Sequence, residues 1–221
     1  DKHHFPVSFV GHPLIDAIQA HPVIDDATFR KENQLNDLPI IALLPGSRKQ
    51  EITKMLSVML SVADDFKRYQ FVIAGAPSQE YSFYQQFITS ENIKFLSNKT
   101  YDLLQHATAA LVTSGTATLE TALFKVPEVV CYKGNWISYQ IAKRIITLKY
   151  ISLVNLIMDK EVVTELIQDD CNTKRIASEL QKILEPEHRK IVLENYRILE
   201  EKLGGKGASS TTAKLIVADL K

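Results

Sequence analysis

The sequence predicts an α/β fold, with a Rossmann-like, doubly wound parallel sheet followed by carboxy-terminal helices. Up to residue 132, short apolar runs of β-type residues alternate with helical patterns. This alternation predicts a parallel sheet with right-handed crossovers. The apolar runs also lack polar alternation, as expected for strands that helices cover on both faces.

Each expected strand is a short apolar run that ends in turn-forming or polar residues. The runs are VSFVG (7–11), PIIALL (39–44), QFVIAG (70–75), NIKFL (92–96), AALVTS (109–114) and EVVCY (128–132). After about residue 160 no further strand is expected. The segment 20–38 is polar and strand-free, which predicts a linker or an exposed helix.

The clearest helical pattern runs from about residue 51 to residue 68. There Ile52, Met55, Leu56 and Met59 recur at the i, i+3, i+4, i+7 spacing of an amphipathic helix. The other predicted helices are 80–89, 101–107, 116–124, 136–148, 173–184, 187–203 and 209–220. The stretch LGGKGASS separates the last two of these.

The composition is that of a globular protein without a dominant charge. Lys plus Arg equals Asp plus Glu, at 26 each, so no basic field points to nucleic acid. Cys131 and Cys171 have no paired spacing, which indicates reduced thiols and not a disulfide framework. The six histidines form no metal-binding motif, so no metal site is predicted. No apolar run approaches the ~20 residues that cross a bilayer.

The first unusual strand-to-helix turn is LLPGSRKQE (43–51). Gly46 allows a sharp turn and a close approach by a ligand. Ser47 is expected to cap the helix, in a capping box with Gln50. Arg48 in the first turn opposes the helix dipole unless an anion or a carboxylate such as Glu51 is near. The turn is either an anion site or a plain capped helix start.

The second unusual turn is TSGTATLE (113–120). Ser114, Gly115 and Thr116 offer hydroxyls and a flexible backbone at a helix start, and Glu120 follows one turn later. A carboxylate suits the paired hydroxyls of a ribose, which donate two hydrogen bonds. Together the two turns predict a nucleoside diphosphate site, and the alternative is a Ser/Thr cap with a solvated Glu. No Gly-x-Gly-x-x-Gly motif follows a strand, which argues against a dinucleotide site.

These two turns, with four further stretches, resemble the lipid-A-disaccharide synthases, a family of GT-B glycosyltransferases. The further stretches are FVGHPL (9–14), AKR (142–144), YISLVNLI (150–157) and ELIQDDC (165–171). They lie in the family's order across most of the chain. The family pattern usually has Pro where this chain has Val154.

The resemblance implies that the chain is the carboxy-terminal, donor-binding half of a GT-B enzyme. Residues 1–38 would form an interdomain linker and first strand, 39–185 a UDP-sugar-binding Rossmann-like domain, and 186–221 closing helices. The expected reaction is that of a hexosyltransferase of lipid A and lipopolysaccharide biosynthesis. It joins UDP-2,3-diacylglucosamine to 2,3-diacylglucosamine 1-phosphate and releases UDP. Neither a metal nor another cofactor is implied.

The residues expected to bind UDP follow from the matched motifs. They are Gly46, Ser47, Arg48, Glu51, Ser114, Gly115, Thr116, Glu120 and Asn155. Arg48, Ser114 and Thr116 would stabilise the UDP leaving group, and Glu51 would hold Arg48. Asn155 could instead be a buried turn residue. No catalytic base is expected here, because the base and the acceptor site would lie in the amino-terminal half. The chain alone is therefore expected to bind UDP without turnover.

Two other readings remain open from the sequence. One is another GT-B relative, such as a UDP-N-acetylglucosamine 2-epimerase, and the other is a non-catalytic UDP-sugar-binding module. The resemblance places the protein in the cytoplasm, peripheral to the inner membrane of a Gram-negative bacterium, and leaves a homodimer open. The helix predicted at 136–148 either touches the membrane or packs on the sheet. Its notable residues are Trp136, Tyr139, Ile141, Lys143 and Arg144.

Overall fold

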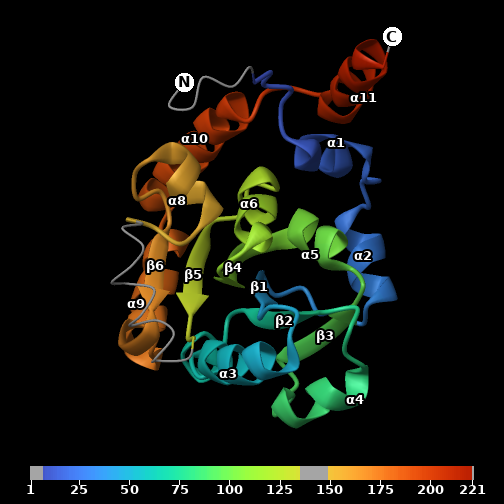
Figure 1. Cartoon of the computed structure of the whole chain (residues 1–221). Helices are drawn as coiled ribbons and strands as arrows, with labels where there is room; N and C mark the ends of the chain where they lie inside the picture. Colours follow the sequence, from blue (N-terminus) through green and yellow to red (C-terminus); the bar gives the residue numbers. More distant parts are fainter. Residues whose placement is uncertain (1–6, 135–148, 221) are drawn as a thin grey trace.

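The computed structural model describes residues 7–134 and 149–220, and its centre is a six-stranded parallel sheet (Figure 1). The strand order is β3-β2-β1-β4-β5-β6, which is the order of a Rossmann-like fold. The predicted fold class is confirmed. The strands are β1 (Ile40–Leu44), β2 (Gln70–Gly75), β3 (Ile93–Ser97), β4 (Ala107–Thr113), β5 (Glu128–Tyr132) and β6 (Thr164–Ile167).

Five of the six predicted strands are present, and the first is wrong. Residues 7–11 form no strand, and Val7 and Phe9 are 86% and 74% exposed. A strand needs a hydrogen-bonding neighbour, and none of the described strands lies beside this segment. The expectation that strands stop near residue 160 is also wrong, because β6 pairs in parallel with β5. The run TELI is short and half polar, as suits an edge strand, so its apolar signal was weak.

The described helices include every helix that was predicted in that part of the chain. They are α1 (Pro13–Ala20), α2 (Asp26–Glu32), α3 (Lys49–Leu60), α4 (Tyr81–Tyr84), α5 (Thr100–His106), α6 (Thr116–Leu123), α8 (Leu153–Met158), α9 (Thr173–Leu184), α10 (Pro186–Lys202) and α11 (Ala208–Asp219). Helices α1 and α8 were not predicted, and α3 ends earlier than expected. The helix expected at 136–148, with the AKR motif, lies outside the described residues.

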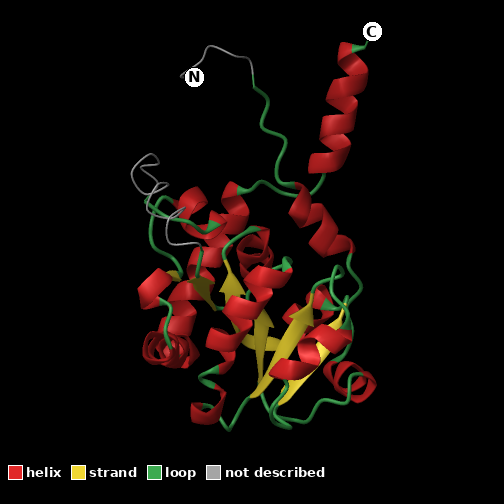
Figure 2. Cartoon of the chain, turned by 60° about the horizontal axis from the view of Figure 1, so that its bottom comes forward, coloured by secondary structure: helices red, strands yellow, loops and turns green. Residues whose placement is uncertain are grey.

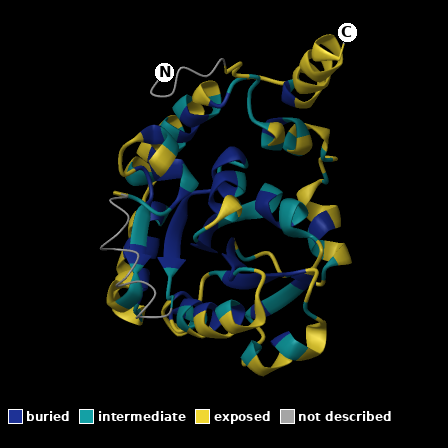
Figure 3. Ribbon diagram, in the orientation of Figure 1, coloured by how far each residue is buried: buried dark blue, intermediate teal, exposed yellow. Residues whose placement is uncertain are grey.

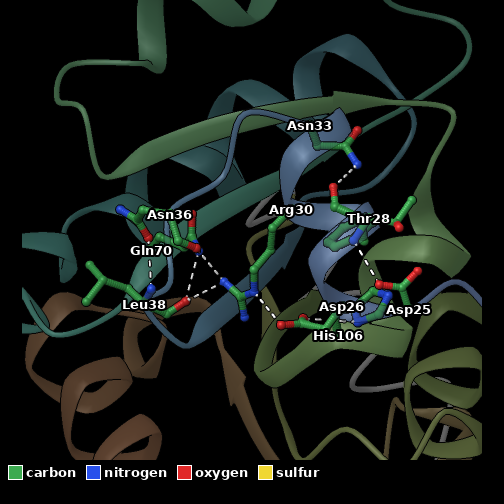
Figure 4. Close-up of polar contacts among 10 residues, drawn as sticks. Asp25, Asp26, Thr28, Arg30, Asn33, Asn36, Leu38, Gln70 and His106 are labelled. Atoms are coloured by element: carbon green, nitrogen blue, oxygen red, sulfur yellow. Dashed lines mark hydrogen bonds and ion pairs between the residues drawn. The ribbon is translucent and has the colours of Figure 1, made fainter.

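Helix α2 is anchored to the sheet and is more than an exposed linker helix (Figure 4). Its Phe29 is fully buried against β1, β2 and α5. Arg30 Nη1 donates hydrogen bonds to the carbonyls of Asn36 (2.5 Å) and Leu38 (3.0 Å). Gln70 at the start of β2 donates to the same two carbonyls, at 2.9 and 2.8 Å. These bonds fix the chain as it enters β1.

The sheet is covered on both faces, as the apolar strands require (Figures 2 and 3). Ile41 and Leu43 of β1 point to one face, where α3 and α9 pack. The alternating residues of β1 point to the other face, where α2 and α5 cover β1 to β4. On that same side of β5, α6, α8 and α10 form a further cluster around Val130. The two cysteines are free and buried in the first cluster.

The two carboxy-terminal helices differ in their packing. Helix α10 belongs to the core through Val192, Tyr196 and Leu199. Helix α11 extends away from the rest in both cartoon views, and only Ala208 of it is buried (Figures 1 and 2). The carboxylate of Asp16 in α1 accepts hydrogen bonds from the Gly207 and Ser209 N–H groups, so it caps α11. Among the described helices, none combines the length and apolar character that a bilayer crossing requires.

Candidate functional site

A cavity of ≈ 520 Å³ opens at the carboxyl ends of the central strands. It lies where β1 and β4 are neighbours, which is the point where the strand order reverses. Ligands of open α/β sheets bind at this switch point. The register pairs Leu44 with Val112, so the residues two places further on, Gly46 and Ser114, face each other across the cavity. The structure thereby joins the two unusual turns of the sequence.

Eight of the nine predicted UDP-binding residues line this cavity. They are Gly46, Ser47, Arg48, Glu51, Ser114, Gly115, Thr116 and Glu120. A larger hollow of ≈ 780 Å³ lies along the edge strand β3 and contains none of them. The smaller cavity is the better candidate for the ligand site because the carboxyl ends of the central strands and two helix starts line it.

The turn after β1 is shaped by contact between Gly46 and Glu51. Gly46 has a φ of +100°, and a Cβ there would lie 2.2 Å from Glu51 Oε2. The same oxygen accepts a hydrogen bond from the Ser47 N–H group at 3.2 Å. Glycine is therefore required both by the backbone conformation and by the carboxylate packed on it.

Two local predictions for this turn are wrong. Arg48, and not Ser47, is the N-cap of α3, and no side chain caps this helix start, so the Ser47–Gln50 capping box does not form. Glu51 reaches back to the Ser47 N–H group and makes no ion pair with Arg48 within the described chain. The exposed Arg48 guanidinium is consequently not held by Glu51.

The turn after β4 places a helix start directly at the cavity. Gly115 is the N-cap of α6, and no side-chain hydrogen bond caps this helix. The first N–H groups of an α-helix lack intrahelical partners, and they attract anions together with the helix dipole. Ser114 Oγ donates to the Ile151 carbonyl at 2.8 Å, and Gly115 and Thr116 are exposed at the cavity.

The half-buried carboxylate of Glu120 lies one turn into α6 and lines the same cavity. Tyr101 of α5 donates its hydroxyl to Glu120 Oε1 at 2.9 Å. Burial and the neighbouring carboxylate together raise the pKa of Tyr101 to about 12. The phenol therefore remains protonated at physiological pH and continues to donate.

The site thus combines an anion-attracting helix start, an arginine and a carboxylate. A model of the lipid-A-disaccharide synthetase family matches residues 1–217. The chain belongs to this family. The matched range contains both cavity turns, all of α10 and most of α11.

Curated lipid-A-disaccharide synthases show the same relationship. The chain is 40% identical to the synthase of Syntrophus aciditrophicus over 223 residues, which covers 97% of this chain and 58% of that protein. It is 35% identical to the synthase of Coxiella burnetii, again covering 97% of this chain and 58% of the relative. The chain therefore spans somewhat more than half the length of the synthases that it matches.

Solved structures show the same fold at low sequence identity. The UDP-GlcNAc 2-epimerase of Neisseria meningitidis, solved with UDP-GlcNAc, superposes with a TM-score of 0.61 at 14% identity. The match covers 95% of this chain and 54% of the epimerase. WaaG, a glycosyltransferase involved in lipopolysaccharide biosynthesis, gives a TM-score of 0.55 at 16% identity and covers 88% and 52%. The family member described here thus has the Rossmann-like architecture of one half of a GT-B protein.

Asn155, the ninth predicted residue, lies outside the cavity and is fully buried. Its Oδ1 accepts from the Val162 and Val163 N–H groups, and its Nδ2 donates to the Val163 carbonyl and to Glu165 Oε1. Every hydrogen-bonding position of the amide is occupied. The prediction of a UDP contact is contradicted, and the alternative of a buried turn residue is supported.

The family stretches around Asn155 support the cavity indirectly. Glu165 accepts hydrogen bonds from the Ile151 and Ser152 N–H groups and from Ser152 Oγ, besides Asn155. This network fixes the Ile151 carbonyl that receives Ser114. Val154 lies in the first turn of α8, where a backbone N–H has no intrahelical acceptor. The proline that the resemblance implies at this position would therefore lose no intrahelical hydrogen bond.

The sequence reasoning missed two parts of the cavity. The end of β2 and the loop after it contribute Gly75, Ala76 and Pro77, and α5 contributes Thr100. The sequence did contain a signal for the first of these parts. Because the carboxyl ends of parallel strands lie at the same edge of a sheet, the turn after QFVIAG (70–75) is expected beside the other two turns. In the described part of the chain, no three ligand-type side chains gather into a metal site.

Proposed function

We propose that this chain is the donor-binding half of a lipid-A-disaccharide synthase. The cavity between β1 and β4 would hold the UDP part of UDP-2,3-diacylglucosamine. The observation that carries the proposal is the meeting of Arg48, the open start of α6 and Glu120 around one cavity at the switch point. These groups match the diphosphate and the ribose of a nucleoside diphosphate.

The diphosphate would bind at the start of α6. The free N–H groups of that helix, with the hydroxyl of Thr116, offer donors to the phosphate oxygens. Arg48 supplies the positive charge from the opposite wall. Negative charge develops on the diphosphate as UDP leaves, and fixed donors at that position lower the barrier.

Glu120 would bind the ribose. A carboxylate near the phosphates repels them, but it accepts hydrogen bonds from the vicinal hydroxyls of the sugar. The N–H bonds of α6 and the carboxylate of Glu120 lie one helical turn apart, about 5 Å along the axis. That separation fits a ribose and a phosphate of one nucleotide.

In the whole protein, the reaction would transfer diacylglucosamine to 2,3-diacylglucosamine 1-phosphate and release UDP. The acceptor pocket and the base that deprotonates the acceptor hydroxyl would come from the part of the relatives that this chain does not span. We place the protein in the cytoplasm at the inner-membrane surface, because both proposed substrates carry acyl chains.

Calorimetric titration of the chain with UDP, ADP and NAD tests the proposal. Of the three ligands, UDP should bind most tightly. Glu120→Gln should weaken the binding of UDP about tenfold, since a hydrogen bond to a charged group contributes about 1.5–3 kcal/mol. Inorganic diphosphate should bind the variant at least as tightly as the wild type, because the variant removes a negative charge near the phosphates. Glu91→Gln, in the hollow beside β3, is the matched control and should leave UDP affinity unchanged. Tighter binding of NAD than of UDP would refute the proposal.

The second candidate is a UDP-N-acetylglucosamine 2-epimerase, which is favoured by the TM-score of 0.61 to such an enzyme bound to UDP-GlcNAc. Both candidates predict UDP binding, so binding alone does not separate them. Incubation of the full-length protein with UDP-GlcNAc separates them, because only an epimerase converts it to the manno-configured product. We favour the synthase because the family match covers residues 1–217.

A further inference from the structure

We propose that Tyr101 is a positioning residue that makes the cavity selective for ribose over deoxyribose. It would do so by fixing the carboxylate of Glu120 in the orientation that two sugar hydroxyls require. This inference rests on the proposed binding of UDP. Tyr101 lies in α5, and it belongs to none of the motifs identified in the sequence.

The contact is specific to one oxygen of the carboxylate. Tyr101 donates to Glu120 Oε1 at 2.9 Å. In the described part of the chain, Oε2 of Glu120 has no hydrogen-bond donor. A carboxylate held at one oxygen keeps its plane and leaves three of its roughly four lone-pair positions for a ligand. Two vicinal hydroxyls can then be accepted together.

Tyr101 itself is held firmly by its surroundings. Its ring lies edge-on to His21 with centroids 5.4 Å apart, and it packs against Phe124 at 5.1 Å. Two side chains of α5 bind the segment before α2. Asp102 Oδ1 is 2.6 Å from His21 Nε2, and Gln105 bonds both the Ile24 N–H group and the Pro22 carbonyl. The phenol is therefore preorganised before any ligand arrives.

Preorganisation has a direct consequence for selectivity. A free Glu side chain loses rotamer freedom when a ligand orders it, and that loss reduces affinity. Because Tyr101 has already ordered Glu120, a ligand with two hydroxyls gains both hydrogen bonds at little entropic penalty. A 2′-deoxyribose can make only one of them, so it gains less from the fixed carboxylate.

The protonation state of the phenol supports this role. Burial, followed by the charge of Glu120, raises the pKa of Tyr101 to about 12. The hydroxyl is consequently a donor at every pH at which the protein would work. The contact therefore acts as a fixed support over this whole range.

The test compares UDP with 2′-deoxy-UDP on the wild-type chain and on Tyr101→Phe, Glu120→Gln and the double variant. Phenylalanine retains the ring contacts with His21 and Phe124 and removes only the hydroxyl. We expect Tyr101→Phe to weaken the binding of UDP about fivefold, or about 1 kcal/mol. The binding of 2′-deoxy-UDP should weaken by less than about twofold. Tyr81→Phe is the matched control, because this half-exposed phenol lies beside Phe95 and away from the cavity. It should change neither affinity.

The double variant separates positioning from a general structural role. If Tyr101 acts through Glu120, its removal should have no further effect on UDP affinity in the Glu120→Gln background. Equal weakening of both ligands, or additive losses in the double variant, would overturn the inference. A melting temperature within a few degrees of wild type confirms that Tyr101→Phe is folded.

A second measurement does not need the Tyr101 variant. With ring-labelled tyrosine, the resonance of Tyr101 should titrate near a pKa of about 12 in the wild type. In Glu120→Gln it should titrate lower, because the neighbouring charge is gone. An unchanged titration would overturn the inference. If UDP fails to bind the wild type, the proposed function fails first. If UDP binds with its Glu120 dependence but Tyr101→Phe changes nothing, only the inference about Tyr101 fails.

Discussion

Gly46→Ala probes the turn that forms one wall of the cavity, and the structure gives the size of its effect. Gly46 has a φ of +100°, where an alanine costs about 1–2 kcal/mol. The added Cβ would also lie 2.2 Å from Glu51 Oε2, so the carboxylate must swing away. Glu51 then loses its hydrogen bond to the Ser47 N–H group and its position at the start of α3, which lowers the free energy of unfolding by about 1 kcal/mol. The expected total is about 2–3 kcal/mol.

Urea denaturation of a double-mutant cycle measures the two contributions separately. In the Glu51→Ala background, Gly46→Ala should cost only the backbone part, so the coupling should be about 1 kcal/mol. The melting temperature of the single variant should fall by about 4–12 °C, at 2–4 °C per kcal/mol for a chain of this size.

The matched control is Gly205→Ala. No atom lies within 4 Å of its Cβ position, and its φ is not in the left-handed region. This substitution should change stability by less than about 0.5 kcal/mol. An equal effect of Gly46→Ala with and without Glu51 would refute the packing of the carboxylate on the glycine. No effect at all would refute the backbone argument.

Further predictions concern the network beside the cavity, a buried acid and the cavity arginine. Glu165→Gln should destabilise the chain by about 2–4 kcal/mol, because four donors converge on this carboxylate. If urea denaturation shows a loss of stability below about 0.5 kcal/mol, the network does not support the fold as described. Burial raises the pKa of Glu128 well above its usual value, so the native state retains a proton that the unfolded chain releases above about pH 4.3. Stability should therefore fall as pH rises from that value, and Glu128→Gln should melt higher than wild type by a margin that grows between about pH 5 and pH 8. A margin independent of pH in thermal unfolding would contradict the assignment. Arg48→Ala should weaken the binding of UDP about tenfold and reduce the salt dependence of that binding. Arg48→Lys should retain part of the affinity and part of the salt dependence. If calorimetry at two ionic strengths shows no difference between Arg48→Ala and the wild type, Arg48 does not belong to the site.

Local chemistry made much of the site predictable. The motifs around Gly46 and Ser114 each combine a glycine, a hydroxyl and a helix start, and such features can be read in a few consecutive residues. The central strands were equally clear, because a strand buried on both faces must be apolar throughout. Eight of the nine proposed contacts consequently line one cavity.

Features that depend on a distant neighbour were missed or misread. Residues 7–11 look like a strand but have no strand beside them, and β6 is a strand with little apolar signal. Asn155 looks like a ligand contact, yet Val162, Val163 and Glu165 use its whole amide. In each case the outcome depends on which hydrogen-bonding partners the fold brings near, and no local pattern contains that information.

The sequence by itself determined the fold class, the family and the two turns, because periodicity and helix-start chemistry are properties of short segments. Only the tertiary structure decided that those turns meet, because the pairing of Leu44 with Val112 sets the distance between them. It also decided the partner of each carboxylate, with Glu51 against Gly46 and Glu120 against Tyr101. The physical reason is that hydrogen bonds and close packing act over a few ångströms in space, whereas Tyr101 and Glu120 are separated along the chain by a whole strand.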